Sequence, residues 1–546
     1  MNRIGDRSSM ASTCRQVSFE CFLKRSTRLW KRIPIVLIVA MASGAWHPVR
    51  AQDSLPGAIQ RITHQAHFKQ AHWGALFVDQ QSGRVIYKHD DEKLFIPAST
   101  TKLYTVACAL EALGPDYQFV TPVVRKGEIN EHGELKGDLI LVASGDLSFG
   151  GRTTPDGKMA FANVDHTYAN GNLEAELTAP DPLEGLNDLA RQVAAAGIKH
   201  VHGEILIDDR LFEQAESSGS GPTKVTPCMV NDNLIDLLFT PTDVGQRAVC
   251  TWRPQSEGVR VESKVTTVNS GKSLDIKIRD LGHGRISVTG KIPYGHKPVL
   301  KVQEVHDARA FARTLFIEAL HRVGVSVDAA TVSEATTSEL PGVADVHQLP
   351  QVAVHRSLPL SESAKLILKV SHNLQASTLP LLVACKHGER TLTAGLKQQH
   401  AFLKHAHVDV DTISLAGGAG GSRADLITPH ATVQLLRYMT TQPSFPVFHS
   451  ALPRLGVDGT LAKNIAHDSP ARDKVHAKTG SLYWDNTMNG SSVMTSKALA
   501  GYMTTAKGRQ VIFAMFVNYA HLGHGVTVKT FGDDLGKICE TVYLHE

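Results

Sequence analysis

The pattern of hydrophobic residues divides the chain into three stretches and limits the folds it can adopt. From about Val124 to Val343 the sequence consists of short β-like runs between glycine-rich turns, interrupted by helical patterns at 183–196 and 308–323. Since domains hold roughly 100–200 residues each, 546 residues exceed one compact core. We therefore predict a split domain, 52–123 and 344–546, interrupted by one or two mainly β inserted domains over 124–343.

The two outer stretches mix strands and helices, which predicts an α/β (α+β) unit. Residues 73–87 form a hairpin pattern, and residues 99–113 repeat apolar side chains at helical spacing until Gly114-Pro115. Helical patterning returns over 360–370 and after Ser371. A hairpin over 500–518, turning at Lys507-Gly508, is predicted to close the chain.

The first 51 residues resemble an export signal. Lysines and arginines precede the apolar run 33–45, and small residues up to Ala51 suit a cleavage site. The alternative is a membrane anchor, but the run is short for a span of about 20 residues and contains Pro34 and Gly44. We expect a periplasmic or otherwise exported protein with at most peripheral membrane contact.

The positive charge of the chain belongs to this signal. Residues 1–51 carry nine Lys or Arg and two Asp or Glu, a net of +7, whereas the whole chain is +4. The remainder is therefore about −3, which removes the basis for neutralising phosphates. No nucleic-acid partner is predicted.

Five cysteines follow residue 51, so at least one thiol is unpaired in any pairing scheme. Cys228 and Cys250 flank a predicted strand pair. In an oxidising compartment they could form a disulfide, and two unlinked cysteines are the alternative.

A Ser-x-x-Lys motif begins the first predicted helix of the outer unit. The spacing places the Ser99 hydroxyl and the Lys102 amine on one helix face. A serine hydroxyl is a weak nucleophile at neutral pH, and a desolvated lysine can take its proton. Taken alone, the motif also fits a capping serine with a surface lysine.

Two further motifs follow in order. Ser371-His372-Asn373 comes after an apolar helical pattern, and Lys478-Thr479-Gly480 lies at the edge of a predicted strand. Ser371 can relay a proton to a leaving amine, and Asn373 can hold a substrate amide. Lys478 and Thr479 can bind a carboxylate, while the glycine permits close approach of the backbone.

Ser-x-x-Lys, Ser-x-Asn and Lys-Thr-Gly in this order are typical of penicillin-binding proteins and serine β-lactamases. Ser371 follows Ser99 by 272 positions, which indicates a large insertion. The chain after residue 52 therefore resembles the penicillin-binding protein 4-type D-alanyl-D-alanine carboxypeptidase/endopeptidase family, the class C low-molecular-mass group. The resemblance implies a β-lactamase/transpeptidase-like core, an antiparallel sheet flanked by helices.

The resemblance also implies the reaction and the roles of residues. A serine D,D-peptidase of this kind cleaves peptidoglycan stem peptides through an acyl-enzyme, and β-lactam antibiotics acylate the same serine. Backbone N–H groups of Ser99 and Ser481 would form the oxyanion hole, and Asp208 would face a diamino acid of the stem peptide. The implied catalytic residues are Ser99, Lys102, Ser371 and Asn373, and the implied substrate-binding residues are Lys478, Thr479, Gly480, Ser481 and Asp208.

The sequence departs from the family near the expected substrate pocket. Relatives often carry Asp-Gly-Ser-Gly before a Ser-Arg pair, whereas this chain has Gly417-Gly418-Ala419-Gly420-Gly421 before Ser422-Arg423. In addition, Ser377 replaces a common acidic residue, and Pro380 follows soon after. The preference for a particular stem peptide is the property these changes affect.

Two other functions fit parts of the pattern. A serine β-lactamase would need a group that positions the deacylating water, and we identify no such glutamate. A non-catalytic cell-wall binding module would not need all of the reactive side chains. His400, His405 and His407 cluster without an acidic partner, which favours surface histidines, and no metal or other cofactor is predicted.

Overall fold

The computed structural model describes residues 54–333, 340–523 and 525–546, so the predicted export signal lies outside the described residues. In those ranges no helix combines the length and the apolar character that crossing a membrane requires. The chain begins there with α1 (Leu55–Thr63), which Ser54 caps with its side chain.

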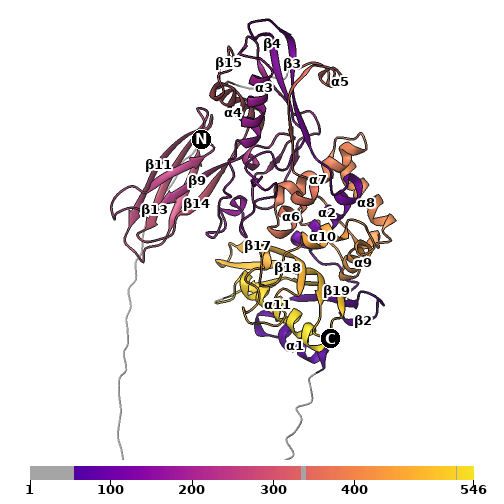
Figure 1. Ribbon diagram of the computed structural model, residues 1–546. Helices are drawn as coiled ribbons and strands as arrows, with labels where there is room; N and C mark the ends of the chain where they lie inside the picture. The colour runs from indigo at the N-terminus through magenta and orange to yellow at the C-terminus, as the bar shows by residue number, and fades with distance from the viewer. Residues whose placement is uncertain (1–53, 334–339, 524) are drawn as a thin grey trace, which may run out of the picture. The chain divides into compact units, whose positions relative to one another are not determined.

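The first and last parts of the chain form one antiparallel sheet with strand order β17-β18-β19-β1-β2, and β20 pairs with β18 (Figure 1). Strand β1 lies between β2 and β19, with His72 opposite Asn518 and Asp79 opposite Val511. The sheet thus joins segments more than 400 residues apart. Its strands are β1 (His72–Asp79), β2 (Val85–His89), β17 (Val475–Asn486), β18 (Ser491–Thr504), β19 (Gln510–Asn518) and β20 (Ala520–Leu522).

Helices cover both faces of this sheet. Alternate residues of a strand point to opposite faces, so Ala75 and Phe77 pack with α1 and α11, whereas Leu76 and Val78 pack with the larger group of helices. An antiparallel sheet flanked by helices is the predicted core. The helices are α2 (Thr101–Leu113), α6 (Leu360–Lys369), α7 (Asn373–Lys386), α8 (Leu392–His405), α9 (Pro429–Met439), α10 (Phe445–Ser450) and α11 (Val528–His545).

A second sheet is built from the middle of the chain, with strand order β15-β5-β4-β3-β16 and β6 paired to β4. Its edge strand β16 pairs with β3; β3 begins at Val120, shortly before the predicted insertion, and β16 lies wholly beyond its predicted end at residue 343. Its elements are β3 (Val120–Ile129), β4 (Glu134–Val142), β5 (His200–Val201), β6 (Ile205–Asp208), β15 (Ser326–Val327), β16 (Gln351–Arg356), α3 (Glu184–Ala195), α4 (Ala308–Arg322) and α5 (Val343–Val346).

Three smaller sheets complete the middle region. Cys228 and Cys250 lie here, and both are free thiols. The sheets have the orders β10-β9-β14, β11-β13-β12 and β7-β8, from β7 (Ala215–Glu216), β8 (Lys224–Val225), β9 (Leu234–Thr240), β10 (Val249–Arg253), β11 (Arg260–Val268), β12 (Asp275–Asp280), β13 (Arg285–Pro293) and β14 (Val299–Glu304).

One expectation about the end of the chain is wrong. The predicted closing hairpin exists as β18 and β19, but α11 follows it. This helix buries Phe531, Leu535, Ile538 and Val542, whose three- and four-residue spacing forms one apolar stripe. The helical period of these residues was therefore the signal for the element that the prediction omitted.

Candidate active site

Ser99 lies in a tight turn, η2 (Ala98–Thr100), directly before α2. Two glycines allow other segments to approach this turn. A Cβ atom on Gly420 would lie 2.0 Å from the Ala98 carbonyl oxygen, and one on Gly480 would lie 2.6 Å from the Pro97 oxygen. Because no other residue lacks a Cβ atom, glycine is required at both contacts. The turn is thereby held between β17 and the glycine-rich segment 417–421.

Lys102 lies beside Ser99 and is fully buried. Its Nζ donates to Ser99 Oγ at 3.0 Å, to Asn373 Oδ1 at 2.8 Å and to the Ala419 carbonyl at 2.6 Å. Burial lowers the pKa of Lys102 to about 7, and the charge of Asp425 only partly opposes this. Near neutral pH this amine can therefore exist without a proton while contacting the serine hydroxyl.

Ser371 forms a second serine–lysine contact. Lys478 Nζ donates to Ser371 Oγ at 2.9 Å and to the Thr479 carbonyl at 2.7 Å. Burial, followed by the charges of Lys102 and Lys497, holds the pKa of Lys478 well below its usual value. Ser371 has a φ of 67°, and the Tyr168 hydroxyl donates to its carbonyl at 2.6 Å. That hydrogen bond holds an unusual backbone conformation in place.

Asn373 begins α7 and joins this helix to the middle region. In addition to accepting from Lys102, it donates through Nδ2 to the Ser220 carbonyl at 3.1 Å. A Cβ atom on Gly219 would lie 2.6 Å from that amide nitrogen, so the loop packs closely against it. Both sides of the Asn373 amide are thus fixed by hydrogen bonds.

His372, between the two motif residues, is fully buried in an ionic network. The Arg152 guanidinium contacts Asp165 at 2.6 Å, Asp232 at 2.6 Å and His372 Nε2 at 3.4 Å. Burial opposes ionisation of both aspartates, but the charge of Arg152 outweighs it and lowers their pKa values. The network therefore anchors the Ser-x-Asn motif to two distant parts of the chain, the segment with Arg152 and Asp165 and the one with Asp232.

His166 completes this network. Its ring nitrogens lie 2.6 Å from Asp236 and 3.0 Å from Asp232. Although burial opposes the charge, the surrounding carboxylates raise the pKa of His166 to about 10. Asp165, His166 and Asp232 are close enough to hold a metal, but Arg152 already neutralises both carboxylates.

The Lys-Thr-Gly motif lies in β17, and its neighbours form a second group of polar contacts. Thr479 Oγ1 donates to Thr460 Oγ1 at 2.7 Å. Ser481 of β17 lies opposite Lys497 of β18, and Lys497 Nζ donates to Ser481 Oγ at 2.7 Å. Burial lowers the pKa of Lys497 to about 8. A third buried amine thus lies next to the motif.

The unusual glycine-rich stretch lies at the site. Ala419 accepts from Lys102, and the Gly418 carbonyl accepts from Thr105 Oγ1 at 2.9 Å. Asp425 supports the segment by accepting from the backbone N–H groups of Ala416 and Ser422. The stretch therefore supplies one backbone oxygen to the Lys102 amine and one to the Thr105 hydroxyl.

The other two differences from the family pattern, Ser377 and Pro380, lie in α7. Ser377 Oγ lies 3.1 Å from Ser217 Oγ, and Pro380 lies inside the helix. A Cβ atom on Gly395 of α8 would lie 2.0 Å from the Pro380 carbonyl oxygen. The two helices therefore pack with their backbones in close contact at this proline.

Asp208 is bonded differently from the other predicted residues. It ends β6, and its carboxylate accepts from Arg210 Nε at 2.8 Å and Arg210 Nη2 at 2.8 Å. Burial opposes its charge, but the hydrogen bonds from Arg210 lower its pKa overall. Its carboxylate is thus satisfied by a residue of its own segment.

Hydrogen bonds join Ser99, Lys102 and Asn373 into one group, and Ser371 and Lys478 into another. Sequence reasoning missed the groups that hold them. Tyr168, Arg152 and Asp232 are single polar residues with no motif of their own, and only their contacts in the fold reveal them. Asp425 and Lys497 were missed for the same reason.

Comparisons with known proteins show the family to which the chain belongs. The model of the D-Ala-D-Ala carboxypeptidase 3 (S13) family matches residues 55–530. The D-alanyl-D-alanine carboxypeptidase of Actinomadura sp. (strain R39) is 29% identical over 472 residues, which are 82% of this chain and 78% of that protein. The D-alanyl-D-alanine carboxypeptidase DacB of Haemophilus influenzae is 25% identical over 456 residues, covering 80% of this chain and 83% of that protein.

Solved structures show the same fold. The crystal structure of penicillin binding protein 4 (dacB) from Haemophilus influenzae matches with a TM-score of 0.66 and 22% identity, over 88% of this chain and 98% of that one. A structure of that protein complexed with a β-lactam matches with a TM-score of 0.64 and 21% identity, over 90% of this chain and 99% of that one.

The fold is that of the transpeptidase-like enzymes, which confirms the predicted fold class. Within this class the chain belongs to the D-Ala-D-Ala carboxypeptidase 3 (S13) family. It is a serine-type D-alanyl-D-alanine carboxypeptidase and hence a hydrolase. The family and the activity expected from the three motifs are confirmed.

Proposed function

We propose that Ser99 is the nucleophile of this peptidase and that Lys102 accepts its proton. One observation carries the proposal: a fully buried amine with a pKa lowered to about 7 lies 3.0 Å from the Ser99 hydroxyl. An amine that is neutral at working pH and in hydrogen-bond contact is suited to general-base catalysis. The hydrogen bonds to Asn373 and Ala419 keep Lys102 in position.

In the first half of the reaction, Ser99 Oγ attacks the carbonyl carbon between two D-alanines. Its proton passes to Lys102 Nζ, and the carbonyl oxygen becomes an oxyanion that the backbone N–H groups of Ser99 and Ser481 stabilise. The C–N bond then breaks, and Lys102 gives up this proton, which passes by way of Ser371 to the leaving amine; Lys478 contacts Ser371 at 2.9 Å. Water hydrolyses the resulting acyl-enzyme and restores Ser99.

The substrate in this proposal is the stem peptide of peptidoglycan, either free or cross-linked. Lys478 and Thr479 lie on the β17 edge beside Ser371 and would bind the terminal carboxylate. Asp208 remains a proposed contact for a diamino acid, and its ion pair with Arg210 would then have to open. β-Lactam antibiotics would acylate Ser99 because they present a reactive amide beside a carboxylate.

We also propose that the protein is exported, with at most peripheral membrane contact and no nucleic-acid partner. The division into a split catalytic domain, 52–123 and 344–546, and an insertion over 124–343 belongs to the same proposal. The strand order supports a split of this kind, because β1, β2 and β17–β20 form one sheet whereas β3–β6, β15 and β16 form another. Since β16 ends at Arg356, the second sheet continues beyond the proposed boundary at 343.

The decisive experiment incubates the protein with defined peptidoglycan fragments and identifies products by mass spectrometry. Release of D-alanine indicates carboxypeptidase activity, and cleavage of cross-linked dimers indicates endopeptidase activity. The Ser99→Ala variant should lose both products and all labelling by fluorescent penicillin. Full peptidase activity in this variant would falsify the assignment of Ser99.

The two alternative functions give different results in the same experiment. A β-lactamase would release hydrolysed penicillin rapidly and leave the peptides intact. A non-catalytic binding module would retain the peptides without cleaving them and would form no stable adduct with fluorescent penicillin.

A further inference from the structure

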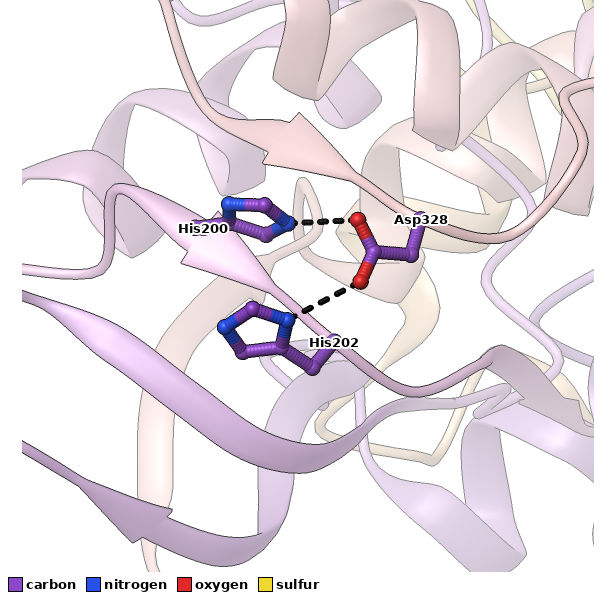
Figure 2. Close-up of side chains that lie close together, drawn as sticks. All are labelled: His200, His202 and Asp328. Carbon is purple, nitrogen blue, oxygen red and sulfur yellow. Dashed lines mark hydrogen bonds and ion pairs between the residues drawn. The ribbon is translucent and has the colours of Figure 1, made fainter.

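Two histidines and an aspartate outside the active site meet at one edge of the sheet β15-β5-β4-β3-β16. Figure 2 shows both rings directed at the carboxylate of Asp328. His200 Nε2 lies 2.6 Å from Asp328 Oδ1, and His202 Nδ1 lies 2.9 Å from Oδ2. The ring centroids are 4.1 Å apart with planes 20° from parallel. Three donor atoms therefore converge on one small volume.

The strand register brings these side chains together. Parallel β15 and β5 place Ser326 opposite His200 and Val327 opposite Val201. The Asp328 N–H then donates to the Val201 carbonyl at 3.0 Å, which fixes the aspartate next to the histidines. Val201 is fully buried, so His200 and His202 share the opposite, solvent-facing side of the strand. The cluster is thus preorganised by backbone hydrogen bonds.

The chemistry of this group suits a divalent transition metal. All three ligand atoms lie within 4.8 Å of one another. Imidazole nitrogen and carboxylate oxygen are the ligands that zinc uses together, and three protein ligands leave a fourth position for water. The three side chains are between 32% and 52% exposed, so a hydrated ion can reach them from solvent.

The buried group Asp165, His166 and Asp232 is less suited to binding a metal ion. There, the Arg152 guanidinium already occupies both carboxylates. At Asp328, both carboxylate oxygens contact histidine nitrogens, which are neutral once deprotonated and then have lone pairs for a metal. A metal ion bound by His200, His202 and Asp328 therefore need not displace a permanent positive charge.

We propose that His200, His202 and Asp328 bind one divalent transition-metal ion, with zinc as the best fit. The ion would connect β5 to β15, each only two residues long, by ligands 126 residues apart in sequence. Such an ion stabilises the folded chain because it binds only where these segments are paired. The site does not depend on the proposed peptidase mechanism.

The test is zinc binding by the full-length mature protein after removal of metals with a chelator. Calorimetric titration with ZnCl₂ should give one site per chain with micromolar or tighter affinity, and saturation should raise the unfolding temperature by several degrees. The double variant His200→Ala/His202→Ala should bind at least about 100-fold more weakly and lose the thermal shift. Asp328→Asn should weaken binding at least about tenfold.

The matched control removes two exposed histidines elsewhere, His400→Ala/His405→Ala, and should bind zinc like the wild type. Labelling by fluorescent penicillin should be equal in all four proteins, which verifies that each is folded. Equal zinc affinity in the wild type and in His200→Ala/His202→Ala would overturn the proposal. So would the absence of binding to the wild type at 100-fold excess zinc.

Discussion

At the scale of single residues, the site is defined by lysine amines whose pKa values are lowered by burial. Lys102, Lys478 and Lys497 are all buried, and burial is the main cause that lowers the pKa of each. A charged lysine loses its hydration when buried, and one unit of pKa corresponds to about 1.4 kcal/mol. The fold therefore holds these residues in a state that favours proton transfer.

The first prediction concerns the pH dependence of acylation. Because Lys102 must lose its proton to act as a base, the second-order rate of acylation by penicillin should rise with pH and reach half its plateau near pH 7. Stopped-flow measurement with fluorescent penicillin between pH 5 and pH 9 checks this. A rate independent of pH over that range would contradict the role of Lys102.

The second prediction is the effect of Lys102→Met. Acylation should slow by at least about 10³-fold, since both the base and its contact with Ser99 are lost. The variant should still fold but with a lower unfolding temperature, because the Asn373 Oδ1 and Ala419 carbonyl acceptors lose their buried donor. Calorimetry beside the acylation assay separates the two effects, and a variant that fails to fold would refute the expectation.

At the scale of elements, the site depends on how closely β17 approaches the turn that carries Ser99. Gly480 is where β17 comes so close that a Cβ atom would lie 2.6 Å from the Pro97 oxygen, and the sequence identified this glycine only as part of a motif. The positions of η2, α2, α6 and α7 were predictable because apolar spacing and the motif serine mark them. The contact between β17 and η2 was not, since no local pattern specifies which segments meet in space.

The third prediction tests this contact with Gly480→Ala. The added Cβ atom would meet the Pro97 oxygen at 2.6 Å and displace β17 from Ser99. Since small misplacements of reacting groups can cost about 100-fold, acylation should slow by roughly that factor. Gly417→Ala is the matched control, because its Cβ atom would have open space and it should acylate normally. Equal rates in the two variants would refute the argument.

Two other side-chain contacts could not be predicted either, because they also depend on which segments meet in the fold. The His-x-His spacing at 200–202 carries no signal by itself, because the third ligand, Asp328, follows 126 residues later and only the pairing of β5 with β15 joins them. Asp208 was assigned by resemblance alone, and its ion pair with Arg210 is invisible without coordinates. Its proposed role stays a prediction.

At the scale of the whole molecule, the Ser-x-Asn motif is tied to the middle region by charge. Arg152, Asp165 and Asp232 surround His372, and His166 adds a further positive group. A buried network of this kind is costly to break at one member, because the partners keep their uncompensated charges. The stability of the middle region and the geometry of the site are therefore coupled.

The fourth prediction follows from His166. Its pKa is about 10 in the folded protein, above the ordinary 6.5, so the protonated form stabilises the fold. This contribution is complete below pH 6.5 and is lost as the pH rises toward 10. The destabilisation caused by His166→Gln should therefore be largest near pH 6 and shrink steadily up to pH 10. Urea unfolding of both proteins at several pH values measures it, and a constant difference would contradict the assignment.

The network around His372 also restricts whether the middle region can be exchanged between related enzymes. A chimera that received the middle region of a relative would need a matching arginine and two matching aspartates, or His372 would face unpaired charges. It would also need groups equivalent to Tyr168 and Ser220, which bond to Ser371 and Asn373. The middle region therefore cannot serve as an interchangeable module, and changes on either side of this boundary must be inherited together.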